Sequence, residues 1–345
     1  MSAPTSTRQW ILASKPTLKP ILSGPSATFE LEINSLPPLE KGQVLLRILY
    51  LSTDAGQRGW IDKNIEPKRL YMPPVQEGDP MRSFGLCEIV ESKAPKLSKG
   101  TKVVAAPNWP EYAVENGSEC NPAQEIPGLP IAAFLGALDA TGLTAYYGLV
   151  EIVRAAKEDT VVVSRAAGAT VQIAKHIVRC KRIIGIAGSD EKCKWVETLG
   201  ADVCINYEKD SFEQAVIKAT PEYASVYFDN VGGEILDLML TRIARFGRIA
   251  ACGAVASYND PNSPGLKNWF EVVSMRIEIK GFIVLDFMPR MGEGLKALLE
   301  VYKEGNLKLD EQNEHVISAG FEEIPNVWWK LFEGENKGKL LTKLV

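Results

Sequence analysis

A regular alternation of apolar strands and amphipathic helices in the second half of the chain limits the fold more than any other feature. Short β-branched runs are separated by helical stretches such as Glu191–Leu199 and Ser211–Thr220. Strands that are apolar throughout are typical of a parallel sheet covered by helices on both faces. The expected strands are Thr160–Ser164, Arg182–Ala187, Val203–Tyr207, Val226–Val231, Arg248–Gly253 and Ile277–Val284. This pattern predicts an α/β fold with a Rossmann-type, doubly wound parallel sheet.

The first part of the chain has a different sequence pattern. Strand-like runs such as Gln43–Leu51 and Phe84–Glu91 are separated by turns rich in Pro and Gly, which predicts a barrel or sandwich. The tail holds one helix candidate, Ile324–Glu333, and a final strand, Lys339–Val345. We therefore expect a substrate domain over residues 1–125, a Rossmann cofactor-binding domain over 126–310, and a return to the substrate domain over 311–345.

Length and composition are those of a soluble two-domain enzyme. The 345 residues are 46% hydrophobic and 24% charged. A net charge of −4 without a basic stripe argues against nucleic acid or an anionic membrane as partner. The N-terminal residues are polar, and no apolar run approaches the length of a membrane span. We expect a cytoplasmic protein that acts on a small molecule.

Metal ligands are scarce. The six cysteines form no Cys-x-x-Cys pair, and the two histidines, His176 and His315, do not sit beside a cysteine. A zinc site needs three or four such ligands converging on one point. The sequence therefore predicts no metal site and mostly buried, reduced thiols.

The first strand-to-helix turn of the predicted Rossmann domain is the expected site for cofactor phosphates. Backbone N–H groups at this turn bind anions, and glycines let the pyrophosphate approach. Here the strand ends at Ser164, and Gly168 is the glycine retained in the turn that follows. The position is right for a dinucleotide, although the turn is poor in glycine.

The end of the second strand indicates which dinucleotide is bound. NAD-selective sites place a carboxylate there to bind the ribose hydroxyls. This strand is instead followed by Gly188, Ser189 and the nearby cation Lys192. A hydroxyl and a cation suit the 2′-phosphate of NADP(H). Alternatively, Ser189 simply caps a helix and Lys192 is a surface lysine.

The fourth strand ends in the sequence Asp229-Asn230-Val231-Gly232-Gly233. This segment can place backbone groups and the Asn230 amide near a cofactor. Alternatively, it is only a turn before a helix.

Taken together, these motifs resemble the leukotriene B4 dehydrogenase/prostaglandin reductase and alkenal double-bond reductase family of the zinc-free medium-chain dehydrogenase/reductase superfamily. The resemblance covers nearly the whole chain. It implies a GroES-like β-barrel substrate domain, a Rossmann domain, and metal-free, NADPH-dependent reduction of the carbon–carbon double bond of α,β-unsaturated ketones and aldehydes. The matching segments are Thr141–Tyr146, Gly188–Lys192, Leu199–Asp202, Asn206–Tyr207, Phe228–Gly233, Cys252–Gly253, Tyr258–Asn259, Gly281–Phe282 and Gly334–Lys339.

The resemblance also implies roles for individual residues. Lys192 and Tyr207 would bind the 2′-phosphate, and Asn230 would face the cofactor. The implied contacts to the rest of the cofactor are the backbone at Phe282 and Val284 and the side chain of Asn336.

The tyrosine that orients or protonates the enolate in the family corresponds to Tyr258. Hydride transfer to the β-carbon builds negative charge on the carbonyl oxygen, which a hydroxyl donor stabilises. Alternatively, Tyr258 is a loop aromatic packed on the domain surface.

The phosphate loop departs from the family pattern. The family reads Gly-x-x-Gly-x-x-Gly, whereas the outer positions here are Arg165 and Val171, and the segment is about one helical turn shorter. Bulky side chains crowd a backbone that must approach phosphate closely. Binding of NADP(H) is therefore doubtful on this loop alone, unless the Arg165 guanidinium itself pairs with a phosphate.

Two further departures concern the substrate side. Asp139 replaces a glycine and is a candidate acid or base; alternatively, it is a solvent-facing loop residue. The family motif Asp-Pro-Tyr-Met-Arg is present as Asp54-Ala55-Gly56-Gln57-Arg58, so its tyrosine is missing. Trp60 and Tyr71 are the candidates to line the pocket instead, or to belong to the core.

Two functions follow from these observations. The first is an NADPH-dependent ene-reductase. The alternative is a cofactor-independent descendant that catalyses an isomerisation, dehydration or cyclisation, with Asp139 or Tyr258 as acid or base. By resemblance we also expect a homodimer joined by edge strands near Phe282–Phe287.

Overall fold

The computed structural model describes residues 3–165, 168–260, 262, 264–309, 314–334 and 336–345. The chain divides into two compact units. Unit 1 comprises Met1–Gly136 and Asp310–Val345, and unit 2 comprises Ala137–Leu309. Unit 2 carries the predicted parallel sheet.

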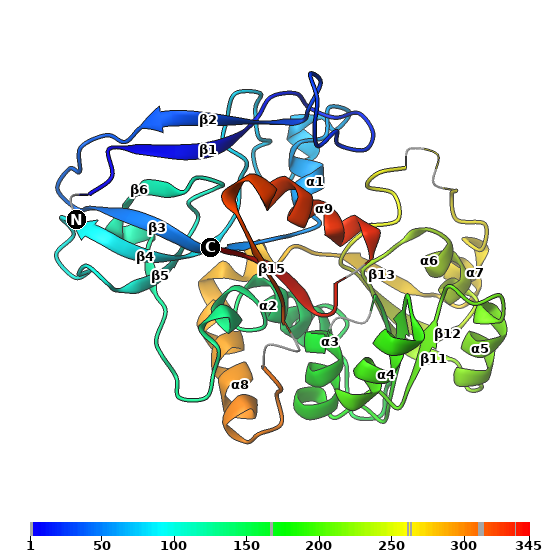
Figure 1. The fold of residues 1–345 in the computed structure, drawn as a ribbon. Coiled ribbons are helices and arrows are strands. Elements are labelled where there is room, and N and C mark those ends of the chain that lie inside the picture. The colour runs from blue at the N-terminus through cyan, green and yellow to red at the C-terminus, as the bar shows by residue number, and fades with distance from the viewer. Residues whose placement is uncertain (1–2, 166–167, 261, 263, 310–313, 335) are drawn as a thin grey trace. The chain divides into compact units, whose positions relative to one another are not determined.

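The sheet of unit 2 has the strand order β10-β9-β8-β11-β12-β13, and every neighbouring pair is parallel. Its strands are almost completely buried at the centre, as the continuous apolar runs require. The prediction of a Rossmann-type sheet is confirmed (Figure 1). The strands are β8 (Thr160–Ser164), β9 (Arg182–Ala187), β10 (Val203–Asn206), β11 (Ala224–Asp229), β12 (Ile243–Ala251) and β13 (Glu278–Gly281).

Helices connect these strands and cover the sheet. Helix α4 contacts β9 and β10, and α5 contacts β10. Between β8 and β9, a short α-helix continues as a π-helix, a geometry that is rare and is found mostly as single turns within α-helices. The helical segments of unit 2 are α2 (Ala140–Tyr147), η4 (Gly148–Ile152), α3 (Gly168–Ile173), η5 (Ala174–Val178), α4 (Asp190–Thr198), α5 (Phe212–Ala219), α6 (Gly233–Leu240), α7 (Phe270–Ser274), η6 (Val284–Arg290) and α8 (Met291–Lys303).

The structure changes from unit 1 to unit 2 within a stretch that the sequence pattern predicts as one buried helix, residues 131–155. The first part is instead a separate 3₁₀ helix, η3 (Ile131–Leu135). Its Ala132 and Leu135 pack with Leu86 and Leu341 of unit 1. The apolar composition therefore reflects burial in two different cores rather than one continuous helix.

Unit 1 is built mainly from antiparallel β-structure. Strands β1 (Ser6–Leu12) and β2 (Phe29–Ser35) form a hairpin, and a larger sheet has the order β14-β15-β3-β4-β5-β7, with β6 on β3 (Figure 1). Helix α9 (Ile324–Glu333) joins the parallel pair β14 and β15. The remaining elements are β3 (Gln43–Ser52), α1 (Gln57–Trp60), η1 (Pro67–Arg69), β4 (Gly85–Ser92), β5 (Lys102–Ala105), β6 (Tyr112–Asn116), η2 (Gly117–Glu119), β7 (Asn121–Pro122), β14 (Glu314–Ala319), η7 (Phe321–Glu323) and β15 (Lys339–Leu344).

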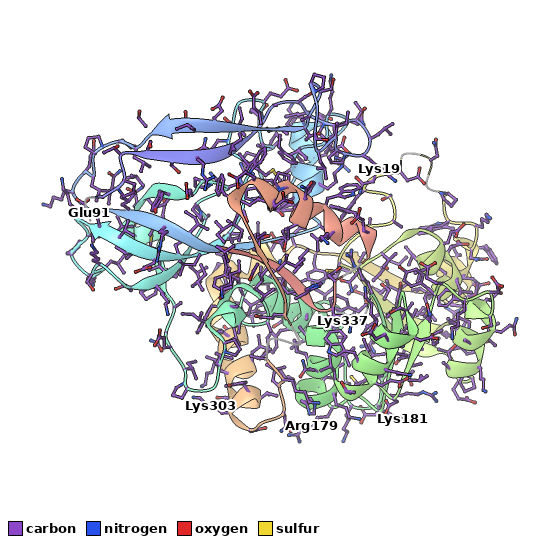
Figure 2. The ribbon with its side chains drawn as sticks, viewed as in Figure 1. Lys19, Glu91, Arg179, Lys181, Lys303 and Lys337 are labelled. Carbon is purple, nitrogen blue, oxygen red and sulfur yellow. The ribbon has the colours of Figure 1, made fainter. Side chains whose placement is uncertain are left out.

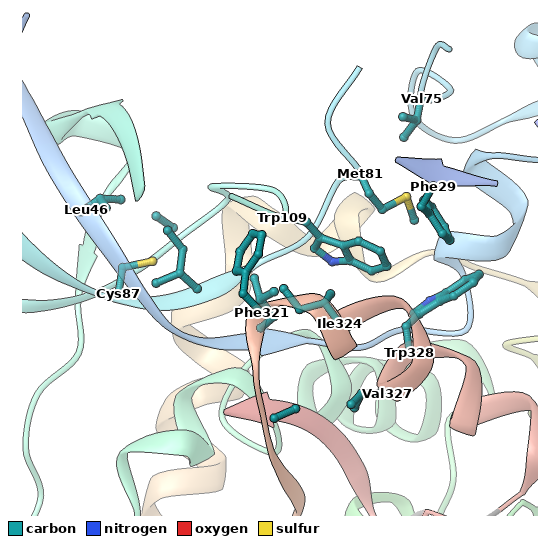
Figure 3. Close-up of a cluster of buried hydrophobic side chains, with 14 of the residues drawn as sticks. Phe29, Leu46, Val75, Met81, Cys87, Trp109, Phe321, Ile324, Val327 and Trp328 are labelled. Carbon is teal, nitrogen blue, oxygen red and sulfur yellow. The ribbon is translucent and has the colours of Figure 1, made fainter. Parts of the chain in front are cut away.

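An aromatic cluster forms the centre of unit 1. Trp109 and Trp328 are fully buried, their ring centroids lie 6.2 Å apart, and Phe29 packs on both (Figure 3). Such edge-on contacts stabilise a core beyond the area they bury. This cluster holds the chain's C-terminal helix α9 in the same unit as the N-terminal strands.

Several charged side chains mark the surface of unit 2. Lys181, Lys303 and Arg179 of unit 2 are exposed and extend from the ribbon (Figure 2). Within the described ranges, every helix is too short or too polar to cross a bilayer.

The substitution Gly142→Ala in α2 is expected to lower the free energy of unfolding by about 1–3 kcal/mol. A Cβ at this position would collide with the backbone carbonyl oxygen of Ala137. Gly292→Ala in α8 is the control, since nothing lies within 4 Å of its added methyl group, and Ala forms helices better than Gly. Urea titration of both variants measures the difference, and equal midpoints would contradict the close contact.

Candidate cofactor site at the carboxyl edge of the parallel sheet

The strand order of unit 2 locates the place where a parallel sheet of this kind binds ligands. From β8 the chain runs outward to β9 and β10, and then crosses to β11, β12 and β13 on the other side. Ligands of open α/β sheets bind outside the carboxyl ends of the strands, where the strand order reverses. Here that point lies between β8 and β11, next to Ser164 and Asp229.

A buried carboxylate organises this point. The side chain of Asp229 is only 1% exposed, and its Oδ1 accepts hydrogen bonds from Tyr227 Oη (2.9 Å) and Ser164 Oγ (3.1 Å). The backbone N–H groups of Val231 and Gly232 also donate to it, each over 3.0 Å. A buried charge is tolerated because it is surrounded by donors. These hydrogen bonds to Asp229 thereby fix the conformation of the turn that follows β11.

Asn230 is tied to β8 from the same place. Its backbone N–H donates to Ser164 Oγ (2.9 Å), and its Nδ2 donates to the Ser164 carbonyl (2.8 Å). Asn230, the predicted cofactor contact, therefore lies where the strand order reverses. Its hydrogen bond to the Ser164 carbonyl of β8 fixes the orientation of its side-chain amide.

The predicted 2′-phosphate residues lie together at the ends of β9 and β10. Ser189 caps α4, because its Oγ accepts from the Lys192 backbone N–H (3.2 Å), and the Lys192 side chain is half-buried in the first turn. The Tyr207 hydroxyl lies over Gly188, 2.9 Å from where a Cβ would be. Capping uses the Ser189 oxygen as acceptor and leaves its proton available to donate, so the cap and a phosphate contact are compatible.

The acidic residue that follows Ser189 is directed away from this corner. Asp190 is exposed and accepts from Asn206 Nδ2 (2.9 Å) and pairs with Lys209 (2.7 Å). These partners lower the pKa of Asp190, the hydrogen bond from Lys209 being the largest cause. Its charge is neutralised within the loop that follows β10.

Two residues of the altered loop serve the packing of α3. A Cβ on Gly168 would lie 2.8 Å from Leu199 Cδ1 and 3.2 Å from Trp195, so glycine here lets α3 pack closely against α4. Val171 is fully buried, which means that its side chain fills the core rather than crowding the sheet edge. Residues 166 and 167, in the middle of the predicted loop, lie outside the described residues.

Arg165 follows β8 directly and has a left-handed backbone, with φ of 44°. Its side chain is half-buried, and burial lowers the pKa of the guanidinium, whereas the hydroxyls of Tyr207 and Tyr258 act in the opposite direction. Arg165 therefore lies near both tyrosines, which come from opposite sides of β8.

Tyr258 lies in the loop after β12, at the same edge of the sheet. The loop is held to β11, since Cys252 and Gly253 donate backbone N–H groups to the Asp229 carbonyl (2.8 and 3.1 Å). The Ala254 N–H donates to Tyr258 Oη (3.4 Å). Burial raises the pKa of the Tyr258 hydroxyl, an effect that this N–H and Arg165 oppose. The hydroxyl therefore stays protonated at neutral pH.

The other predicted residues are spread more widely. Asp139 precedes α2, where its backbone carbonyl accepts from the Leu143 N–H (3.0 Å), and its side chain is half-exposed. Phe282 follows β13 and packs edge-on against Phe228 (6.2 Å between ring centroids), while Val284 opens η6. Asn336 belongs to unit 1, where its Nδ2 donates to the Gly338 carbonyl (2.8 Å).

In unit 1, Tyr71 occupies space next to the glycine that replaces the family tyrosine. Its hydroxyl lies 3.0 Å from the position of a Cβ on Gly56 and accepts from Trp60 Nε1 (2.8 Å). Trp60 is buried in the core, whereas Tyr71 is about half exposed. Of the two candidates, Tyr71 is therefore the one available to contact a ligand.

Comparison with known proteins identifies the family. Two family models match, one described as the N-terminal domain of oxidoreductase (residues 8–123) and one as zinc-binding dehydrogenase (residues 167–300). Prostaglandin reductase 1 of Bos taurus is 36% identical over 92% of this chain and 94% of that protein. The NADPH-dependent curcumin reductase of Escherichia coli K12 is 33% identical over 98% of this chain and 96% of that protein.

A solved structure gives the same result. The crystal structure of CurA in complex with NADPH from Vibrio vulnificus is similar with a TM-score of 0.87 and 30% identity, over 98% of this chain and 99% of that chain. The chain belongs to the zinc-free medium-chain dehydrogenase/reductase superfamily. The resemblance seen in the sequence is thereby confirmed. In the described part of this medium-chain reductase, no three His, Cys, Asp or Glu side chains are grouped so that they could hold a metal ion.

The carboxyl edge fits the dinucleotide of a medium-chain reductase. Gly188 lacks the Cβ that would press on Tyr207, and the following positions provide the Ser189 hydroxyl and the Lys192 cation where an NAD site has a carboxylate. When bound, the nicotinamide supplies a hydride. The Asp229 carboxylate, by contrast, is a structural group that sequence reasoning did not single out. The available signal was a polar pair, Ser164 and Asp229, at the ends of two buried strands.

Replacing Asp229 by Ala is expected to lower the free energy of unfolding by at least about 3 kcal/mol. The change leaves Tyr227 Oη and two backbone N–H groups buried without an acceptor, each at about 1–3 kcal/mol. Asp210→Ala, at an exposed position after β10, is the control and should change stability by less than about 0.5 kcal/mol. Chemical denaturation compares the two, and similar losses for both would refute the organising role of Asp229.

Proposed function

We propose that this protein reduces the carbon–carbon double bond of an α,β-unsaturated ketone or aldehyde with NADPH and without a metal. The observation that carries the proposal is the corner formed by Ser189, Lys192 and Tyr207, which has a hydroxyl and a cation in place of the NAD-type carboxylate. The names of the relatives agree, since they include a prostaglandin reductase and an NADPH-dependent curcumin reductase. The cofactor is accordingly NADP(H).

The protein's part in the chemistry is to stabilise charge on the substrate. Hydride arriving at the β-carbon leaves negative charge on the carbonyl oxygen, and the α-carbon must then receive a proton. A fixed hydrogen-bond donor at the carbonyl oxygen lowers the barrier to the first step. A protonated side chain or water supplies the proton in the second.

Tyr258 is the residue that we assign to this task. Because burial raises the pKa of its hydroxyl, the side chain keeps its proton and acts as a donor. The Ala254 N–H occupies one acceptor position of the oxygen, which leaves the O–H free to point away from the loop. Asp139, half-exposed ahead of α2, is the second candidate for proton transfer.

The alternative, a cofactor-independent enzyme for isomerisation, dehydration or cyclisation, has no observation in its favour. Its premise was that the bulky residues of the altered loop block the phosphates. Val171 is buried in the core and Gly168 serves helix packing, so neither crowds the edge of the sheet.

The cofactor preference tests the proposal. Lys192→Ala should weaken NADPH binding about 10- to 100-fold and leave NADH binding unchanged, because a charge-assisted hydrogen bond to the 2′-phosphate is lost. Lys194→Ala, an exposed lysine on the same helix, is the matched control and should change neither affinity. Calorimetric titration gives both dissociation constants. An equal loss for NADPH and NADH would refute the assignment of Lys192.

The role of Tyr258 has its own test. Tyr258→Phe should lower kcat on an enone about 100-fold or more while NADPH affinity is retained, because only the donor to the developing enolate is removed. Tyr223→Phe is the control, since Tyr223 precedes β11 and lies at the opposite edge of the sheet. Steady-state kinetics with a range of enones and enals decides the matter. A kcat equal to that of the wild type would remove Tyr258 from the mechanism.

We further propose that the protein is a cytoplasmic homodimer. Free thiols at all six cysteines suit a reducing compartment. Strand β13 is the last strand of its sheet, and Trp269, Phe270 and Val273 near it are more than half exposed. The predicted contact segment near Phe282–Phe287 follows β13, and its part from Val284 is a 3₁₀ helix in the single chain. Light scattering after gel filtration should give twice the chain mass of 37.9 kDa, and a monomeric mass would refute the dimer.

A further inference from the structure

The unusual residue at the sheet edge is Arg165, and its position is closely defined. It follows Ser164, whose hydroxyl and carbonyl hold Asp229 and Asn230. The Arg165 backbone is therefore anchored where the strand order reverses, between β8 and β11. In a doubly wound sheet this is the place where the middle of a dinucleotide crosses the strand ends.

The backbone conformation of Arg165 is one that an arginine adopts at a cost. Its φ of 44° lies in the left-handed region, where a glycine is unstrained and a side chain is disfavoured. Residues in this region cluster at ligand-binding sites, where the strain is offset by what the side chain does. The backbone conformation at this position is thus better suited to glycine.

Along this edge, Arg165 follows the central strand β8, with the end of β10 on one side and the end of β12 on the other. Its positive charge lowers the pKa of the hydroxyl of Tyr207, after β10, and of that of Tyr258, after β12. These two tyrosines mark the adenosine end and the substrate end of the site in the proposed function. A guanidinium between them lies where the two halves of a dinucleotide are joined.

We propose that the Arg165 guanidinium binds the pyrophosphate of the cofactor and replaces the anion-binding amides of the missing glycine-rich turn. The inference rests on the proposed function, since it assumes that the dinucleotide lies along this edge. A planar guanidinium forms paired hydrogen bonds with phosphate oxygens, which a short turn with few glycines does not provide.

Substitution by glycine separates a binding role from a structural one. Arg165→Gly relieves the left-handed strain of the backbone, so the variant should fold while NADPH and NADH both bind about 10- to 100-fold more weakly. Arg179→Gly is the matched control, because Arg179 also has a left-handed backbone (φ 62°) and is exposed at the end of η5 (Figure 2). It should gain stability without any change in affinity.

The two cofactors identify the phosphate concerned. A loss shared equally by NADPH and NADH supports the pyrophosphate, and Arg165→Lys should recover part of it because the charge is kept. A loss confined to NADPH would move Arg165 to the 2′-phosphate and overturn the proposal, as would unchanged affinity for both. A wild-type protein that binds neither cofactor would instead refute the proposed function, so the two failures are distinguishable.

Discussion

The hydrogen bonds that converge on the buried Asp229 carboxylate hold the functional edge of this protein together. They join the end of β8, through Ser164, to the turn that follows β11. The Asp229 carbonyl accepts from the loop after β12 as well, so three strand ends are fixed relative to one another. Arg165, Asn230 and Tyr258 each follow one of these strands. Their positions thus depend on a group that is itself buried among hydrogen-bond donors of the protein.

The altered turn between β8 and α3 shows how a fold survives the loss of a functional motif. Gly168 remains because α3 packs too closely on α4 for a side chain, and Val171 is accommodated because it faces the core. Helix α3 continues as the π-helical segment η5. Packing contacts therefore keep helix α3 in place. In our proposal, the Arg165 side chain binds the anion that the backbone of a glycine-rich turn binds in the family.

Much of the fold could be predicted because local patterns are strong in it. The expected strands Thr160–Ser164 and Arg182–Ala187 match β8 and β9, since continuous apolar runs have few alternatives in a parallel sheet. Other segments differ from the expected ones, two of them instructively. The apolar stretch from Ile131 is not one helix, and β13 ends at Gly281 rather than at Val284. Apolar composition indicates that a residue is buried. It does not indicate in which core the residue is buried, or at which residue a strand stops pairing with its neighbour.

The sequence by itself determined the α/β class and, through its resemblance to known reductases, the membership of the superfamily, because strand periodicity and short motifs are local properties. Only the tertiary structure decided that Asp229 organises the edge, that Gly168 is needed for helix packing, and that the Tyr207 hydroxyl lies over Gly188. These facts depend on contacts between segments far apart in the chain. Such contacts arise when the strands are brought into register, so no single segment of sequence contains them.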